Sequence, residues 1–233
     1  KITKKTKAIM LIHVLSNSTN MDRLLKLKKK YNLIIIEDTC ESLGSKYKNK
    51  YLGTFGDFST FSFYYSHQIT SGEGGMVCCK EKSDYEIMKS LRSHGWSRGL
   101  VNEKKISNTF KEIDSKFVFY NSGYNLRPTD ITAAIGSNQF KRLDKFSSIR
   151  SYNRSKIINS IKKDPRWNNQ ITFIESRKYV EPSWFGLPFY LNKKLQINKS
   201  TFIKRLEKLG VETRPIISGN FTKQPSAKKY KLI

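Results

Sequence analysis

One segment of the sequence combines reactive side chains and glycines in a way that suits catalysis. Residues 61–76 read Phe-Ser-Phe-Tyr-Tyr-Ser-His-Gln-Ile-Thr-Ser-Gly-Glu-Gly-Gly-Met, an alternating aromatic stretch, a polar stretch and a glycine cluster. Glycine permits positive φ angles and a close approach of backbone to a ligand. Histidine ionises near neutral pH and is therefore a suitable general acid or base. We expect a strand, a loop and a strand, with Ser62, Ser66 and His67 presented to a ligand by the loop.

A pair of carboxylates follows an apolar run earlier in the chain. Leu33–Ile36 is wholly apolar and leads directly into Glu37 and Asp38, so it predicts a buried strand with acidic groups at its carboxyl end. Ligands of α/β sheets bind at that edge. Taken alone, either interpretation of Asp38 is plausible, and an isolated aspartate after a strand caps a following helix more often than it acts in catalysis.

The elements around these residues predict a parallel sheet with crossover helices. An apolar run at Ala8–Leu15 indicates a buried strand, and Met21–Lys30 has its leucines on one side of a lysine-rich helix. This order of strand, helix and strand is typical of α/β proteins. Later patterns indicate strands and a helix at Phe58–Tyr64, Met76–Cys79 and Ser83–His94.

The last hundred residues predict a long helix and a smaller α+β region. Thr129 is a suitable N-cap for a helix that continues to about Lys163, where Pro165 follows. Short strands are expected at Phe117–Tyr120, Phe185–Leu191 and Val211–Ile217, and a further helix at Lys199–Leu209.

Composition excludes several classes of protein. There are 44 basic and 19 acidic residues, a formal charge of +25, but the lysines are scattered along the chain and no nucleic-acid-binding motif accompanies them. The sequence contains no run of eighteen apolar residues, which a membrane-spanning helix would need. The first lysines are not followed by a signal-peptide pattern. We expect a globular protein of the cytoplasm that binds neither nucleic acid nor membrane.

The three cysteines, Cys40, Cys78 and Cys79, form a poor disulfide framework because their number is odd and two are adjacent. An ordinary iron–sulfur site needs four thiolates. The sequence therefore predicts a reducing compartment, no iron–sulfur cluster and no metal site.

Several motifs, in order, resemble those of the DegT/DnrJ/StrS-type sugar aminotransferases, a family that uses pyridoxal 5′-phosphate (PLP). Residues 37–44 resemble the family's Glu-Asp-x-x-x-x-Leu-Gly motif, and residues 62–75 its Ser-Phe-x-x-x-Lys-x-x-x-x-Gly-Glu-Gly-Gly motif. Residues 123–130 resemble Gly-Tyr-Asn-x-Arg-x-Thr-Asp/Glu. The resemblance covers the chain from about Lys7 to Lys223 and departs at one decisive place. His67 stands where the family has the lysine that forms a Schiff base with the cofactor, which an imidazole cannot do.

The resemblance assigns roles to single residues. Asp38 would bond the pyridine nitrogen of the cofactor and Ser62 its phosphate, while Asn125 would reach across a dimer to the neighbouring phosphate. His67 and Glu41 resemble the histidine-bearing 3-dehydratase branch, in which the cofactor is held non-covalently in its amine form, pyridoxamine 5′-phosphate. Residues that we expect at the substrate are His94, Arg127 and Arg214.

The resemblance also implies the fold and its completeness. We expect the aspartate-aminotransferase-like, type I fold of PLP-dependent transferases, with a mainly parallel sheet and a smaller α+β C-terminal domain. Residues 1–128 would be the C-terminal part of the large cofactor-binding domain, and residues 129–233 the linking helix and an incomplete small domain. Family members have a longer N-terminal part and a further C-terminal helix, so the chain is predicted to be a fragment.

Three functional hypotheses follow. The first is a homodimeric enzyme that removes the C3 hydroxyl of a nucleotide-linked 4-keto-6-deoxy sugar in deoxysugar biosynthesis, of lipopolysaccharide or another glycan. The second is a non-catalytic remnant or binding module that kept the fold. The third, an ordinary sugar aminotransferase, is disfavoured by His67, because transamination depends on the Schiff-base lysine.

Overall fold

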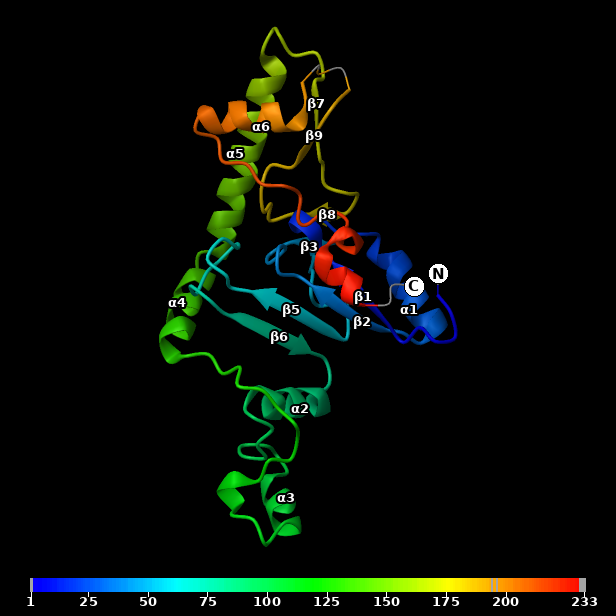
Figure 1. Cartoon of the computed structure of the whole chain (residues 1–233), viewed down its shortest axis with the longest axis vertical. Coiled ribbons are helices and arrows are strands. Elements are labelled where there is room, and N and C mark those ends of the chain that lie inside the picture. The colour runs from blue at the N-terminus through cyan, green and yellow to red at the C-terminus, as the bar shows by residue number, and fades with distance from the viewer. Residues whose placement is uncertain (1, 194, 196, 231–233) are drawn as a thin grey trace. The chain divides into compact units, whose positions relative to one another are not determined.

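The computed structural model describes residues 2–193, 195 and 197–230, which form two compact units (Figure 1). The first unit comprises Lys1–Lys156 and Ser176–Gly186, and the second comprises Ile157–Glu175 and Leu187–Ile233. The chain thus passes between units within a long helix. The predicted division into a cofactor-binding domain and a small domain at residues 128 and 129 remains a prediction.

A four-stranded sheet is the centre of the first unit. Its order is β1-β2-β5-β6, with β1, β2 and β5 parallel and β6 antiparallel to β5. The strands are β1 (Ala8–Ile12), β2 (Ile34–Asp38), β5 (Phe58–Ser62) and β6 (Gly75–Cys79). The mainly parallel sheet predicted from the sequence is therefore confirmed, and parallel pairing places the carboxyl ends of β2 and β5 at one edge.

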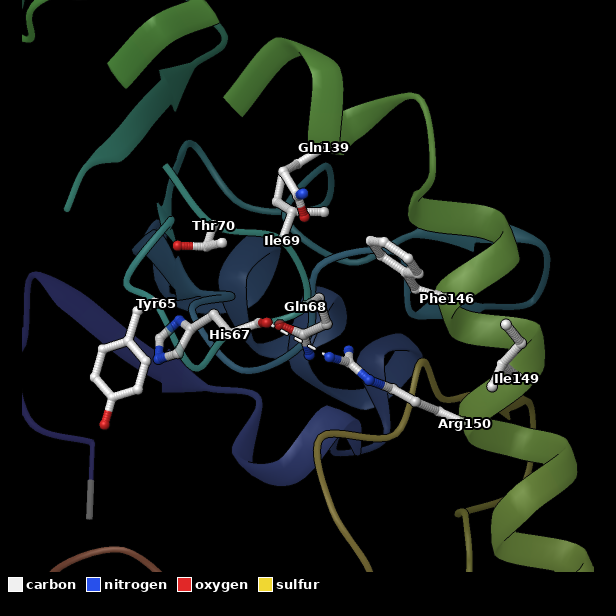
Figure 2. Close-up of a pocket in the computed structure, with 9 residues that line it drawn as sticks. All are labelled: Tyr65, His67, Gln68, Ile69, Thr70, Gln139, Phe146, Ile149 and Arg150. Atoms are coloured by element: carbon white, nitrogen blue, oxygen red, sulfur yellow. Dashed lines mark hydrogen bonds between the residues drawn. The ribbon is translucent and has the colours of Figure 1, made fainter. Parts of the chain in front are cut away.

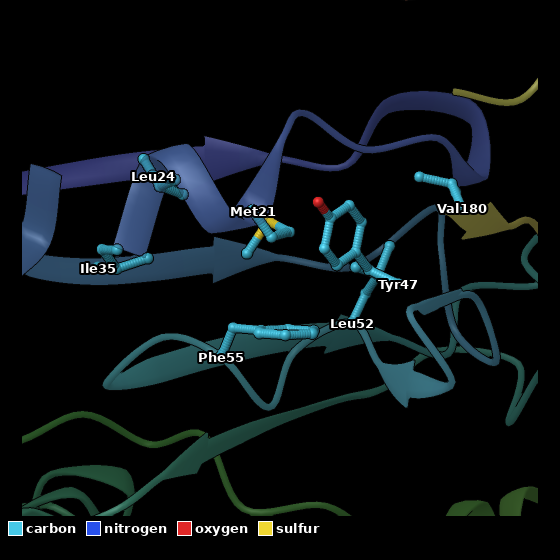
Figure 3. Close-up of a cluster of buried hydrophobic side chains, with 7 residues drawn as sticks. All are labelled: Met21, Leu24, Ile35, Tyr47, Leu52, Phe55 and Val180. Carbon is cyan, nitrogen blue, oxygen red and sulfur yellow. The ribbon is translucent and has the colours of Figure 1, made fainter. Parts of the chain in front are cut away.

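Helix α1 (Met21–Tyr31) makes the crossover between β1 and β2. It begins where the side chain of Asn20 accepts a hydrogen bond from the backbone N–H of Arg23, and it ends at Asn32, which has a left-handed φ of 48°. Figure 3 shows Met21 and Leu24 pointing from α1 towards Ile35 of β2. One face of the sheet is thereby buried.

The hydrophobic core continues into a small antiparallel sheet of order β4-β3-β8, which comprises β3 (Lys46–Tyr47), β4 (Lys50–Tyr51) and β8 (Val180–Glu181). Tyr47 is 2% exposed and its hydroxyl donates to Asp22 at 3.0 Å. The buried cluster consists of Met21, Leu24, Ile35, Tyr47, Leu52, Phe55 and Val180 (Figure 3). Each large apolar side chain buried in this way contributes about 1.5–3 kcal/mol.

The opposite face of the four-stranded sheet is open. Met10, Ile12, Ile34 and Val77 are 45% to 57% exposed. The register pairs Ile12 with Asp38, Asp38 with Thr60, and Thr60 with Val77, so these side chains share one face. The prediction of a buried strand at Ala8–Leu15 was therefore wrong in part. The strand ends at Ile12, and the side chains of its alternate residues are exposed to solvent. A 3₁₀ turn, η1 (Val14–Ser16), follows it.

The single long helix predicted after Thr129 is present as two helices with a break between them. Thr129 is confirmed as the N-cap of α4 (Asp130–Phe140), because its hydroxyl accepts from the N–H of Thr132. The predicted single helix is interrupted where Arg142 N donates to Gln139 O at 2.9 Å, a three-residue turn. The remaining helical segments of this part are α2 (Lys82–Arg92), α3 (Glu103–Thr109), η2 (Ser115–Phe117) and α5 (Leu143–Lys163).

Two expected strands do not form. Of Phe117–Tyr120 only Phe119 pairs, in an isolated bridge with Trp96. Among the residues that the structure describes, Val211–Ile217 joins no sheet, since Pro215 has no N–H to donate and Ile217 has a left-handed φ of 50°. Apart from Phe117, which ends η2, both segments are irregular.

The second unit is a small mixture of strands and helices. Strands β7 (Ile171–Phe173) and β9 (Phe189–Leu191) pair antiparallel, so that β9 is shorter than the strand predicted at Phe185–Leu191. Aromatic contacts connect Phe173 to Phe189 and Phe189 to Phe202. Besides the end of α5, its helical segments are α6 (Lys199–Lys208), η3 (Phe221–Lys223) and η4 (Pro225–Lys229). Across the described part of the chain, no helix is long and apolar enough to cross a membrane.

Candidate functional site

Asp38 and Ser62 end adjacent parallel strands of the sheet. The register pairs Asp38 of β2 with Thr60 of β5, and Ser62 follows two residues later, so both side chains lie on the open face at the carboxyl edge. The carboxylate of Asp38 accepts from the backbone N–H of Cys40 at 3.0 Å. No helix begins after Asp38, so the cap alternative does not apply.

Cys40 lies beside this carboxylate and is held as a neutral thiol. Burial raises its pKa to about 11, with a further contribution from its hydrogen bond to Asp38. The Sγ atom lies 3.8 Å from the hydroxyl of Thr60. At neutral pH Cys40 is therefore a protonated neighbour of Asp38 and a poor nucleophile.

The loop after Ser62 is closed by its own hydrogen bonds. Phe63 N donates to Gly74 O and Ser71 N donates to Phe63 O, both at 2.9 Å. Gly72 has a φ of 84°, which is the left-handed geometry expected of this glycine cluster. The hydroxyl of Ser62 accepts from Tyr64 N at 3.3 Å, so its proton remains available for a ligand.

His67 lies within this loop and is half-buried. Its ring meets the rings of Phe185 and Tyr64 edge-on, at centroid distances of 5.3 and 5.9 Å. Its Nδ1 atom is buried and has no hydrogen-bond partner among the described residues. The imidazole is thus held by aromatic packing while a ring nitrogen keeps its capacity for a hydrogen bond.

A cavity of about 290 Å³ adjoins the loop on the side of α4 and α5. Figure 2 shows Arg150 of α5 extending towards the backbone of His67, whose carbonyl oxygen accepts from Nη2 at 3.5 Å. Burial lowers the pKa of Arg150, which remains a cation at neutral pH. The lining residues are Tyr65, His67, Gln68, Ile69, Thr70, Gln139, Phe146, Ile149 and Arg150.

Glu41 and Gln68 belong to a hydrogen-bond network beside this loop. The Glu41 carboxylate accepts from the backbone N–H of Leu15 at 2.9 Å, so this expected cofactor contact is anchored to η1. The side-chain amide of Gln68 donates to the carbonyl oxygen of Glu41 at 2.5 Å. Gln68 is not predicted from the sequence, because glutamine is mostly a surface residue and nothing in its sequence context signals burial.

Glu37, unlike its neighbour Asp38, is fully buried, and its hydrogen bonds stabilise the fold. Its carboxylate accepts from the Nε2 atom of His13 at 2.9 Å and from the backbone N–H groups of Gly53, Phe55 and Gly56. Burial by itself raises the pKa of Glu37, but the hydrogen bonds from His13, Gly56 and Gly53 outweigh burial and lower the pKa. Glu37 thus fixes the turn before β5 and the end of the strand that carries Asp38.

A second cluster contains three of the expected residues. The ring of His94 lies 5.3 Å from that of Trp96, and the guanidinium of Arg127 lies over the same indole at 5.4 Å. Asn125 is exposed and pairs through its backbone with Ser93. The structure therefore brings His94 and Arg127 together around Trp96, and Asn125 lies in the backbone bridge to Ser93, next to His94 in the chain.

Glycines allow this second cluster to form. The backbones of residues 93–97 and 121–125 cross so closely that a Cβ atom on Gly123 would lie 2.1 Å from Gly95 N. A Cβ atom on Gly95 would lie 1.6 Å from Asn121 O, and Gly95 has a φ of 85°. Only glycine fits at either position without movement of backbone.

Arg214 belongs to the second unit, where its guanidinium pairs with Glu212 at 3.1 Å. Within the described ranges, no three His, Cys, Asp or Glu side chains group as metal ligands would. The absence of a metal or an iron–sulfur cluster remains a prediction from the sequence.

Comparison with known proteins places these residues in a family. The sequence profile of the DegT/DnrJ/EryC1/StrS aminotransferase family matches residues 1–232. The chain belongs to this family. It is 35% identical, over 231 residues, to GDP-4-keto-6-deoxy-D-mannose 3-dehydratase of Escherichia coli O55:H7, a match that includes 98% of this chain and 58% of the relative. The chain thus spans somewhat more than half of the length of that relative.

Solved structures agree with this assignment. The E. coli GDP-4-keto-6-deoxy-D-mannose 3-dehydratase with bound hydrated PLP superposes with a TM-score of 0.86 at 34% identity, over 98% of this chain and 58% of that one. A histidine-to-asparagine variant of GDP-4-keto-6-deoxymannose 3-dehydratase with bound GDP-perosamine has the same TM-score at 33% identity and the same two coverages. The expected aspartate-aminotransferase-like fold of the DegT family is therefore confirmed, and homologues bind PLP and a nucleotide sugar.

Proposed function

We propose that the intact protein removes the C3 hydroxyl of a nucleotide-linked 4-keto-6-deoxy sugar, with PLP and its amine form as cofactor. The observation that carries this proposal is His67, which occupies the loop position of the family's Schiff-base lysine. A chain without that lysine has lost the group that anchors the cofactor covalently, yet it keeps a proton-transfer group in the same loop. Similarity to a 3-dehydratase over 98% of the chain supports the same reaction.

The residues at the sheet edge suit this cofactor chemically. Asp38 offers a carboxylate for a protonated pyridine nitrogen, and the hydroxyl of Ser62 retains a proton for a phosphate oxygen. Asn125 and Glu41 are the further residues that we propose at the cofactor. When bound, the cofactor supplies an electron sink that stabilises negative charge on the carbon next to its ring.

His67 has the properties of an acid–base group. It is half-buried, oriented by two aromatic rings, and keeps a ring nitrogen without a partner in the described part of the chain. We propose that its imidazole accepts a proton as the reaction begins and returns one to the C3 oxygen as that oxygen leaves. His94 and Arg127, around Trp96, and Arg214 are our proposed contacts to the nucleotide sugar.

We further propose a homodimer, in which Asn125 reaches the cofactor of the other subunit. Support comes from α4, an apolar helix without a buried side chain, on which Ile131 and Phe140 are 74% and 59% exposed. Exposed apolar surface of this kind marks an interaction site. We place the protein in the cytoplasm, in deoxysugar biosynthesis for lipopolysaccharide or another glycan.

The proposal is tested by product analysis. The intact protein is incubated with PLP, glutamate and a GDP- or dTDP-linked 4-keto-6-deoxy sugar, and products are identified by liquid chromatography and mass spectrometry. A 3-deoxy product is the expected result. A 4-amino sugar would instead identify a sugar aminotransferase, and an unchanged substrate in every combination would favour a non-catalytic remnant or binding module.

A further inference from the structure

Gln68 directly follows His67 and is buried in a way that its residue type does not suggest. Its side chain is 2% exposed. The Nε2 atom donates to the carbonyl oxygen of Glu41 at 2.5 Å and to the hydroxyl of Ser16 at 3.2 Å. A buried amide with two such bonds restricts the backbone that carries it.

The acceptors of Gln68 are themselves fixed. Ser16 donates its hydroxyl to the same Glu41 carbonyl at 2.7 Å, and the Glu41 carboxylate accepts from Leu15 N. Leu15 and Ser16 have φ angles of 53° and 68°, a left-handed geometry that is costly outside glycine. The strained turn at Leu15 and Ser16 is therefore held against Glu41 by hydrogen bonds. Gln68 bonds to both Ser16 and Glu41.

This network joins the two segments that carry the proposed chemistry. Glu41 lies three residues after Asp38, and Gln68 lies one residue after His67. On the other side of the loop, Arg150 donates to the carbonyl oxygen of His67. The backbone at His67 is thus restrained at two points. Arg150 of α5 bonds to the carbonyl oxygen of His67, and the side chain of Gln68 bonds to Glu41, in the segment that follows β2.

We propose that Gln68 is a positioning residue, whose amide holds His67 in register with the segment from Asp38 to Glu41. The significance of this position for catalysis rests on the proposed role of His67, but the restraint itself does not. This positioning role needs the N–H donors of the Gln68 amide, because its two acceptors, the Ser16 hydroxyl and the Glu41 carbonyl oxygen, are held in place by other hydrogen bonds. A carboxylate of the same size would face the Glu41 carbonyl oxygen without a donor and would repel it.

The test measures the reactivity of each histidine in this chain. The chain has three histidines, so modification by diethyl pyrocarbonate can be followed separately at His13, His67 and His94 by peptide mass spectrometry. His13 is fully buried and reports any global loosening, while His94 reports the second cluster. The variants are Gln68→Ala and Gln68→Glu. The matched control is Gln139→Ala, a glutamine of the same cavity that donates to neither Ser16 nor Glu41.

For Gln68→Ala we expect the modification rate of His67 to rise about five- to thirty-fold, the change in a local opening equilibrium that corresponds to losing one or two buried hydrogen bonds. Gln68→Glu should raise the rate at least as much, while Gln139→Ala should match the unmodified chain. His13 and His94 should keep their rates in all variants.

An unchanged His67 rate in both Gln68 variants would overturn the proposal, and so would a parallel rise at His13. A Gln68→Glu variant that behaves like the unmodified chain would show that Gln68 only fills space, which also contradicts the assignment. None of these readouts requires activity. A selective rise at His67 in a protein whose dehydration rate is unaffected by Gln68→Ala would therefore uphold the restraint and count against the catalytic role of His67.

Discussion

The carboxylate of Glu37 lies 2.9 Å from the imidazole of His13, and neither side chain is exposed to solvent. Three backbone N–H groups of the turn before β5 complete the coordination of this carboxylate. Because successive residues of a strand point to opposite faces, the same strand end directs Glu37 into the core and Asp38 to the open edge. The buried pair of Glu37 and His13 therefore fixes the end of β2 that carries Asp38.

Replacing Glu37 by Gln should destabilise the chain by about 3 kcal/mol, since it leaves the buried N–H groups and His13 without their anionic partner. Equilibrium unfolding in urea at neutral pH measures the change. Asp22→Asn is the control, because the asparagine amide oxygen can still accept from the Tyr47 hydroxyl and only the half-exposed ion pair with Lys48 is lost. Equal effects of the two substitutions would contradict the role assigned to Glu37.

The stability of the chain should also depend on pH through Glu37. Hydrogen bonds lower its folded-state pKa below the ordinary 4.5. The stabilisation is thus complete above pH 4.5 and is lost as pH falls from there through the lower, folded-state pKa. Unfolding free energies measured downwards from pH 6 should decline more steeply in the unmodified chain than in Glu37→Gln. Parallel curves would show that Glu37 titrates alike in the folded and unfolded states.

The open face of the sheet should bind an apolar dye. Parallel sheets are normally covered on both faces, yet Met10, Ile12, Ile34 and Val77 remain about half exposed. We expect the folded chain to enhance the fluorescence of anilinonaphthalene sulfonate, and the double substitution Met10→Thr, Ile12→Thr to reduce it severalfold. Enhancement that is unaffected by this change would assign the dye to another surface.

The chain by itself should hold PLP weakly. Asp38 lies on the uncovered face of the sheet, so a ring bound there would stay in water, and His67 cannot form the covalent bond of a lysine. We expect the cofactor to be lost on dialysis, with an absorbance spectrum of the dialysed chain like that of the apoprotein. Retention of cofactor at micromolar concentration would refute this expectation.

The crossing of Gly95 and Gly123 should be sensitive to a single methyl group. Gly123→Ala places a Cβ atom against backbone and should lower the unfolding free energy by about 1–3 kcal/mol. In the intact protein it should also weaken nucleotide-sugar binding, because Asn125 and Arg127 follow on the same segment. Gly186→Ala is the control, since a Cβ atom there meets nothing within 4 Å. Thermal denaturation of both variants provides the comparison.

Prediction from the sequence succeeded where a local pattern determines the structure. The apolar run before Glu37, the Thr129 cap and the glycine cluster each had a local physical meaning, and the corresponding strand, helix start and loop are present. It failed where distant contacts decide. Val211–Ile217 has strand-like composition but pairs with no strand of the described residues, and Met10, on one face of β1, stays 55% exposed.

The site shows the same limit. Motifs indicated Asp38, Ser62 and His67 as candidates, and strand geometry explains why the first two share an edge. The buried roles of Glu37 and Gln68 depend on partners at residues 13, 16, 41 and 53–56, which no local pattern connects. Burial of a glutamine amide or of an ion pair becomes visible only in three dimensions.

A lysine at position 67 should change the chemistry in a recognisable way. In the intact protein, His67→Lys should attach PLP covalently, so that borohydride reduction adds the mass of the cofactor to the protein, and dehydration should be suppressed. The unmodified protein, treated identically, should gain no mass. Covalent retention by the unmodified protein would contradict the absence of a Schiff-base residue.

The central claim is that His67 transfers the protons of a 3-dehydration, and the rate of the His67→Asn variant tests it most directly. Asparagine keeps a polar side chain but cannot act as an acid or base near neutral pH. With a 4-keto-6-deoxy nucleotide sugar, PLP and glutamate, we expect formation of the 3-deoxy product by the intact protein to fall roughly 10²- to 10⁴-fold, while the affinity for cofactor stays nearly unchanged. Dehydration by His67→Asn at the rate of the unmodified protein would show that the assignment of His67 is wrong.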